Sequence, residues 1–237
     1  MRENVFTFWE GTMPSYIQLC MMTWKFPCAN LIILNYGNLK NYTNISDDAL
    51  EQLKRFTLPQ IADYVRVHVL RDQVGYWLDA DTIIINCELP TTNMIGDTNL
   101  RTQTIGYLHS DEPYSDLFVK WAEYQDSIIN DPSSSPKLWS IMGNSFTDNY
   151  VRTHGEVSIC SVDNCWAETY MIPGNIPRID KYKRFYFNEA FKLENLRPTN
   201  MLMLHNSWTP DWYKKLSVND VIAQNCTMSN ILRELTY

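Results

Sequence analysis

The stretch Gly75–Asn86, with the sequence GYWLDADTIIIN, places two carboxylates between two apolar runs. The flanking runs Tyr76–Leu78 and Thr82–Ile85 contain the bulky and β-branched residues that are typical of a buried strand. Most acidic pairs of this spacing are solvated surface pairs, but exposed charges rarely follow an apolar strand. Asp79 and Asp81 would repel each other in a nonpolar environment unless a cation lies between them. We therefore predict that both bind a hard divalent cation at the carboxyl end of a central strand.

Strand patterns alternate with helix patterns along the chain, which predicts one α/β, Rossmann-like domain over residues 1–237. Its central sheet is expected to be mixed and mostly parallel, flanked by helices, with ligands bound beyond the carboxyl ends of the strands. Besides the central stretch, strands are expected at Val5–Phe8, Leu31–Leu34, Thr102–Leu108, Val157–Ile159 and Met201–Leu204. Helices are expected from Thr12 to Trp24, after Ser46, and over Leu58–Gln73 and Tyr114–Ile129. The segment Trp139–Val151 is expected to be helical at its ends and interrupted around Gly143-Asn144-Ser145.

A last helix, at about 217–235, is expected as an appendage to this domain. Trp212 and Tyr213 precede it, so a membrane surface or a second subunit are alternatives to packing on the core, which is the default.

Composition excludes several classes of function. The net charge of −7 argues against a nucleic-acid binder, which needs a concentrated basic face. No glycine-rich phosphate loop and no G-x-S-x-G motif is present, so the usual nucleotide loops and a serine hydrolase are unsupported. The six cysteines show no zinc spacing and are expected to be reduced thiols. No apolar run approaches a membrane span and no leader pattern precedes the first strand, so we expect a cytoplasmic protein that makes at most peripheral membrane contact.

Three further side chains or pairs fall where a ligand is expected. Trp9 directly follows the first strand, and its ring either stacks on a nucleobase or is a half-buried core aromatic, with equal weight from physics alone. His205 follows the strand Met201–Leu204 and either completes the metal site or is a structural histidine. Asp63 and Arg66 share one helix face. They either form a surface ion pair or lie at the rim of a cleft, where Asp63 would contact a sugar hydroxyl and Arg66 a phosphate or the donor sugar.

Four motifs in order carry a family resemblance: FWEG at Phe8–Gly11, ADYVR at Ala62–Arg66, GYWLDAD at Gly75–Asp81 and LHNSW at Leu204–Trp208. Together they resemble the capsular-polysaccharide-synthesis glycosyltransferases, which have the GT-A fold and are related to initiating mannosyltransferases and large clostridial toxins. The resemblance covers roughly Val5 to Trp208 and implies a single GT-A domain. It also implies a nucleotide-sugar donor, a divalent metal (manganese or magnesium) and retention of anomeric configuration.

The resemblance also implies a role for each matching residue. Asp79, Asp81 and Arg66 correspond to the catalytic group, and Asp79, Asp81 and His205 to the metal ligands. Trp9 matches the base-stacking tryptophan, Asp63 and Arg66 the pair that contacts donor sugar and ribose, and Trp208 the diphosphate segment. The donor-binding set comprises Phe8, Trp9, Gly11, Asp63, Arg66, Asp79, Ala80, Asn144 and Trp208. Two departures from the family pattern are Asn144, where relatives have proline, and Gln73-Val74-Gly75 in place of Tyr-Gly-Gly.

The function that the resemblance implies is metal-dependent transfer of a sugar, expected from a UDP-sugar, to an oligosaccharide or polysaccharide acceptor. Two alternatives are a non-catalytic nucleotide-sugar or glycan-binding module and a metal-dependent hydrolase. If the reaction inverted the anomeric centre, a carboxylate base would be needed, and Asp111, Asp163 and Glu168 are the candidates.

Overall fold

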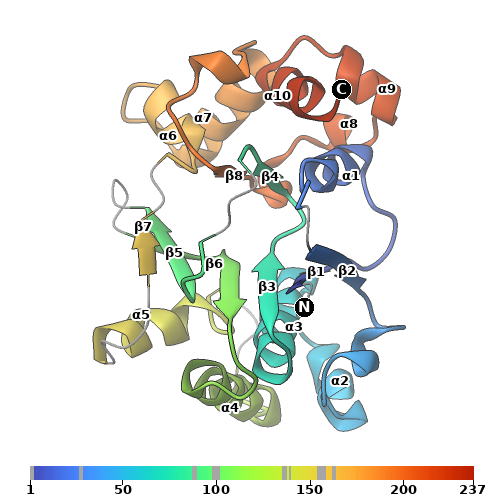
Figure 1. The fold of residues 1–237 in the computed structure, drawn as a ribbon, viewed down its shortest axis with the longest axis vertical. Helices are drawn as coiled ribbons and strands as arrows, with labels where there is room; N and C mark the ends of the chain where they lie inside the picture. The colour runs from blue at the N-terminus through green and yellow to red at the C-terminus, as the bar shows by residue number, and fades with distance from the viewer. Residues whose placement is uncertain are drawn as a thin grey trace.

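The structure is a computed structural model that describes residues 3–26, 29–86, 90–97, 102–134, 138, 140–153, 159–161 and 164–237. It has two layers, seen in the lower and upper halves of Figure 1. The lower layer is a six-stranded sheet with helices below it, and the upper layer is a two-stranded sheet surrounded by short helices.

The main sheet has the strand order β2-β1-β3-β6-β5-β7. Strands β1 and β2 pair in parallel, as do β1 with β3 and β5 with β7, while β6 is antiparallel to both of its neighbours. The strands are β1 (Glu3–Phe8), β2 (Ala29–Leu34), β3 (Gly75–Leu78), β5 (Met94–Asp97), β6 (Thr102–Ser110) and β7 (Ile159–Ser161). The predicted α/β fold with a mixed, mostly parallel sheet is therefore confirmed.

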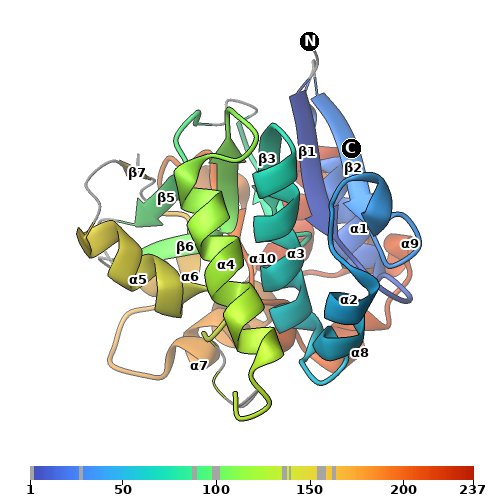
Figure 2. The same cartoon turned by 90° about the horizontal axis from the view of Figure 1, so that it is seen from below.

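The lower face of the sheet is covered by α2 (Asp47–Leu53), α3 (Leu58–Asp72), α4 (Asp116–Asn130) and α5 (Asn144–Thr153). Figure 2 shows α3 and α4 side by side across the sheet. Phe6, Trp77 and Leu108 point down into the core between the sheet and these helices. The side chains at alternate positions, such as Val5 and Tyr76, point up toward the second layer, as the pleat of a strand requires.

The upper layer is built around β4 (Thr82–Ile84) and β8 (Met201–Met203), which pair antiparallel. Its helices are α1 (Ser15–Met22), α6 (Ala167–Met171), α7 (Arg178–Lys183), α8 (Asp211–Lys214), α9 (Val218–Ala223) and α10 (Thr227–Thr236). Short helical turns are η1 (Leu39–Asn41), η2 (Arg184–Asn188), η3 (Leu193–Asn195) and η4 (Asn206–Trp208). N-terminal and C-terminal segments share this layer's core, where Ile17 of α1 packs with Ile231 and Leu232 of α10.

Several predicted elements differ in detail from the structure. The central stretch is two strands in two different sheets, β3 and β4. The predicted last helix is α9 and α10, separated by residues 224–226, and both pack on the protein through buried residues such as Val221 and Met228. The predicted apolar strand Leu31–Leu34 is β2, which begins at Ala29 and lies at the edge of the sheet, where Leu31 is 45% exposed. In the predicted segment Trp139–Val151 the described helix begins at Asn144, and residues 157 and 158 of the expected strand lie outside the described residues.

No helix in the described ranges is long and apolar enough to cross a membrane.

Candidate active site

The turn Asp79–Asp81 is where the chain passes from the main sheet to the small upper sheet. The backbone N–H of Asp79 donates to the carbonyl oxygen of Gly106 at 2.9 Å, which extends the pairing of β3 with β6. The turn then closes with a 2.9 Å hydrogen bond from the N–H of Thr82 to the carbonyl oxygen of Asp79. Ala80, between the two carboxylates, is buried in the upper core. Asp79 and Asp81, on either side of it, line a cavity.

The carboxylate of Asp79 is held by two residues of the lower layer. Its Oδ1 accepts a hydrogen bond of 2.9 Å from the Trp77 indole and lies 3.1 Å from Nη2 of Arg66. The same Nη2 lies 2.7 Å from Asp63 Oδ1, and the guanidinium also donates to the carbonyl oxygen of Ile105. The side chains of Arg66 and Asp63 are only 5% and 11% exposed, so their pairing is not the surface ion pair of the simpler interpretation. Arg66 thus fixes Asp79 from behind and has little capacity left for a ligand.

Burial raises the pKa of two carboxyl groups in this site. The pKa of Asp81 rises to about 7 because the group is buried and Asp79 lies nearby, against a lowering by a 2.7 Å hydrogen bond from the backbone N–H of Asn206. Burial likewise raises the pKa of Asp63 to about 7, although Arg66 opposes it. A cation bound between such carboxylates would reduce their mutual repulsion and stabilise their ionised forms.

These residues line a cavity of about 630 Å³, a size that suits a small-molecule ligand. It is bounded by the end of β1, by α3, by the Asp79–Asp81 turn and by residues 204–207 after β8. The predicted site residues on its wall are Phe8, Trp9, Asp63, Arg66, Asp79, Ala80, Asp81, Asn144 and His205. The structure therefore brings together residues that are far apart in the sequence.

Two predicted residues do not lie on the cavity wall. Gly11 is exposed, with a φ of +83° that explains the glycine as a turn residue. Trp208 packs its ring 3.9 Å from that of His205, so it supports the wall from behind. Trp9 combines both alternatives considered for it, because its ring packs partly against the upper core and also lines the cavity.

His205 lies in the cavity as an uncharged imidazole. Burial, helped by the positive charge of Arg178, lowers its pKa to about 3. Its Nε2 is buried without a hydrogen-bond partner among the described residues. Within those residues no three His, Cys, Asp or Glu side chains are close enough to hold a metal ion together. Asp79, Asp81 and His205 share the cavity without forming such a group, and His205 as a ligand stays a prediction.

Residues 1–160 match the model of the capsular polysaccharide synthesis protein family. The chain belongs to this family. A comparison with curated proteins found no match. The family match includes Trp9, α3 and the Asp79–Asp81 turn, whereas the part of the cavity wall formed by Arg178 and His205 lies beyond it.

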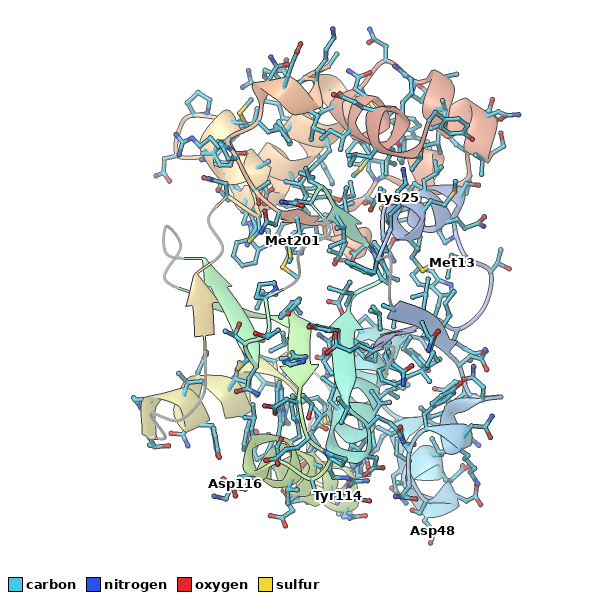
Figure 3. The ribbon with its side chains drawn as sticks, in the orientation of Figure 1. Met13, Lys25, Asp48, Tyr114, Asp116 and Met201 are labelled. Carbon is cyan, nitrogen blue, oxygen red and sulfur yellow. The ribbon has the colours of Figure 1, made fainter. Side chains whose placement is uncertain are left out.

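Neither of the two candidate bases that the structure describes, Asp111 and Glu168, lines the cavity. Asp111 follows Ser110, which pairs with Gly75 at the opposite end of β3 from Asp79. Tyr114 and Asp116, which follow Asp111 in the sequence, lie at the lower end of the molecule in Figure 3, far from Met201 at the start of β8. Glu168 is fully buried against Arg178 and does not line the cavity, and Asp163 lies outside the described residues.

The cavity residues that were not predicted from the sequence include Trp77, Gly106, Trp166 and Arg178. Trp77 and Gly106 position Asp79, and Trp77 lies inside the central motif, where its alternation with Asp79 was a usable signal. Trp166 and Arg178 belong to the upper layer and carry no local signal, because only the tertiary fold brings them to the site.

Proposed function

We propose that the chain is a metal-dependent glycosyltransferase that moves a sugar from a nucleotide-sugar donor, a UDP-sugar, to a glycan acceptor with retention. The observation that carries the proposal is the pair Asp79 and Asp81 on the wall of a 630 Å³ cavity, in a chain of the capsular polysaccharide synthesis family.

The donor atoms in the cavity suit a divalent cation. Asp79 keeps a side chain that is 35% exposed. Burial, together with the neighbouring Asp79, raises the pKa of Asp81 to about 7, and a bound cation would favour its ionised form. Manganese and magnesium ions accept two carboxylates and complete their coordination with water and substrate phosphates. A bound cation would supply Lewis-acid neutralisation of the charge that develops on the leaving diphosphate.

The protein side chains orient the substrate. Trp9 offers an aromatic face at the end of β1 for the base of the nucleotide. Arg66, fixed between Asp63 and Asp79, holds the Asp79 carboxylate in a single orientation. Asp63 faces the same cavity with a pKa near 7, and it is suited to a hydrogen bond with a sugar hydroxyl. Closure of such a site excludes water, which would otherwise compete with the glycan acceptor.

Manganese-dependent release of UDP from common UDP-sugars, with and without oligosaccharide acceptors, tests the proposal. We expect Asp81→Asn to abolish release and to weaken Mn²⁺ binding measured by electron paramagnetic resonance. Asp111→Asn is the matched control, because Asp111 is an exposed aspartate at the other end of the sheet. Nuclear magnetic resonance of the product's anomeric proton distinguishes retention from inversion. No nucleotide release and no UDP binding across UDP- and GDP-sugars would overturn the proposal.

Two other functions give different results in the same experiment. A binding module without catalysis would bind the nucleotide sugar but never release UDP, and Asp81→Asn would leave that binding unchanged. A metal-dependent hydrolase would release product at its full rate without any acceptor. We favour transfer because of the family match.

A further inference from the structure

Arg178 is the first residue of α7, in the upper layer, and lines the cavity. Its guanidinium lies 4.8 Å from the ring centre of Trp166 and 5.6 Å from that of Trp208. Its Nε donates a 2.9 Å hydrogen bond to Oε1 of Glu168, whose side chain is completely buried. Two indole rings and a buried carboxylate therefore fix this cation in one place, and a fixed guanidinium loses little entropy when it binds a ligand.

Most of the hydrogen-bonding capacity of Arg178 is unused. Nε has Glu168, but neither Nη1 nor Nη2 has a hydrogen-bond partner among the described residues, and Nη2 is buried. The side chain is 33% exposed. An unsatisfied buried N–H is costly, so an arginine held in this state at a cavity wall is suited to an acceptor that arrives with the ligand.

The other arginine on the cavity wall differs in each of these respects. Arg66 is 5% exposed, contacts Asp63 and Asp79 and also donates to a backbone carbonyl oxygen. Its charge is balanced inside the lower layer. Of these two arginines, Arg178 is thus the one whose Nη donors remain for a substrate.

We propose that Arg178 recognises an oxyanion of the substrate through its Nη donors, either a phosphate of the donor diphosphate or the carboxylate of an acidic sugar. Arginine suits both, because its planar fork matches two oxygens of either group. This inference rests on the proposed function for the identity of the substrate, but the anion binding can be tested without a nucleotide.

The test is calorimetric titration with pyrophosphate and Mn²⁺, which contains the diphosphate but neither base nor sugar. We expect Arg178→Gln to weaken binding by about 10- to 100-fold, as loss of a charge-assisted hydrogen bond predicts. The control is Arg184→Gln, because Arg184 has the same Nε contact to a glutamate, Glu189 at 3.1 Å, but is 55% exposed and lies off the cavity wall. The double variant Arg178→Gln/Glu168→Gln replaces the buried carboxylate together with the cation and keeps the test valid if the single variant unfolds.

A second titration compares UDP-glucuronate with UDP-glucose. Loss of pyrophosphate binding assigns the phosphate as the ligand of Arg178. Unchanged pyrophosphate binding with a lost preference for the glucuronate assigns the carboxylate. If a folded variant lacking Arg178 shows neither change, the inference is wrong. Failure of the wild-type protein to bind any UDP-sugar, with Arg178-dependent pyrophosphate binding intact, would instead overturn the proposed donor and leave this inference standing.

Discussion

Gly106 lies on β6 directly beside the carboxylate of Asp79, and its replacement by alanine is a geometric test of the site. A Cβ at this position would lie 2.8 Å from Asp79 Oδ2 and 2.6 Å from the terminal methyl group of Met203. The methionine end is flexible and can rotate away. The carboxylate cannot move freely, because its Oδ1 is held at 2.9 Å by Trp77 and at 3.1 Å by Arg66.

The size of the effect follows from these distances. Ordinary contacts begin at 3.4 Å, so the carboxylate would have to move by about 0.6 Å, which strains both of its hydrogen bonds. Disturbing the groups that orient a metal ligand typically weakens metal binding by about 10- to 100-fold. Overpacking should reduce the free energy of unfolding by about 1–3 kcal/mol, which leaves a folded protein if its stability is typical.

The assay is titration with Mn²⁺, with the unbound ion measured by electron paramagnetic resonance, beside a urea denaturation curve. Gly174→Ala is the control, since Gly174 is exposed, has a φ of +99° and has no atom within 4 Å of its added Cβ. That variant should lose about 1–2 kcal/mol of stability for its backbone conformation and bind Mn²⁺ normally. A folded Gly106→Ala variant that binds Mn²⁺ within twofold of the wild-type affinity would refute the assigned position of Asp79.

Three further predictions concern the scaffold around the site, each measured by urea denaturation. Arg66→Met should cost about 3–5 kcal/mol because it leaves the buried carboxylate of Asp63 without its cation. Lys54→Met, which breaks an exposed pair of the same spacing, should cost less than about 0.5 kcal/mol, and equal losses would contradict the burial argument. Gly75→Ala should cost about 2–5 kcal/mol, because its φ is +140° and its Cβ would overlap a backbone carbonyl of β1, and a loss no larger than that of Gly174→Ala would exclude the overlap. Burial holds the pKa of His68 well below its usual value, so the unfolded chain binds the proton more readily and His68 should lower the free energy of unfolding as pH drops below about 6.5, by up to about 1.4 kcal/mol per pH unit. His205, with its pKa lowered to about 3, contributes in the same direction, and Asp63 and Asp81, with raised pKa values, in the opposite direction, so the contribution of His68 is the difference between the slopes of the wild type and His68→Gln; identical slopes would contradict it.

The parts of the fold that sequence patterns predicted are those with local signals. The helix α3 begins after Thr57, whose backbone N–H donates a 3.0 Å hydrogen bond to the side-chain oxygen of Gln60, as in a capping box. Pro59 lies in its first turn. The break between α9 and α10 has no comparable signal, because Cys226 is the N-cap of α10 and makes no side-chain capping bond. A continuous helical pattern was therefore the reasonable prediction for that segment.

The central stretch shows a different limit of sequence patterns. The strands β3 and β4 on either side of Asp79–Asp81 are fully buried, as predicted, but burial alone does not tell which sheet each strand joins. The partners decide it: β3 pairs with β1 and β6, whereas β4 pairs with β8, more than a hundred residues further along the chain. The carboxylates could be predicted from the sequence, whereas Arg178 could not, because it reaches the cavity only through the packing of the upper layer.

The structure anchors the two carboxylates of the motif to different layers. Asp79 is held by the lower layer, through Gly106, Trp77 and Arg66. Asp81 is held by the upper layer, because its side chain accepts the N–H of Asn206 at 2.7 Å just after β8. The separation of the two carboxylates therefore depends on how the layers sit together, and any substitution that shifts one layer against the other changes the geometry available to a cation. Since Arg178 belongs to the upper layer, a substrate that contacts it and a cation held by Asp79 would join the two layers across the cavity, and ligand binding should stabilise their arrangement against unfolding.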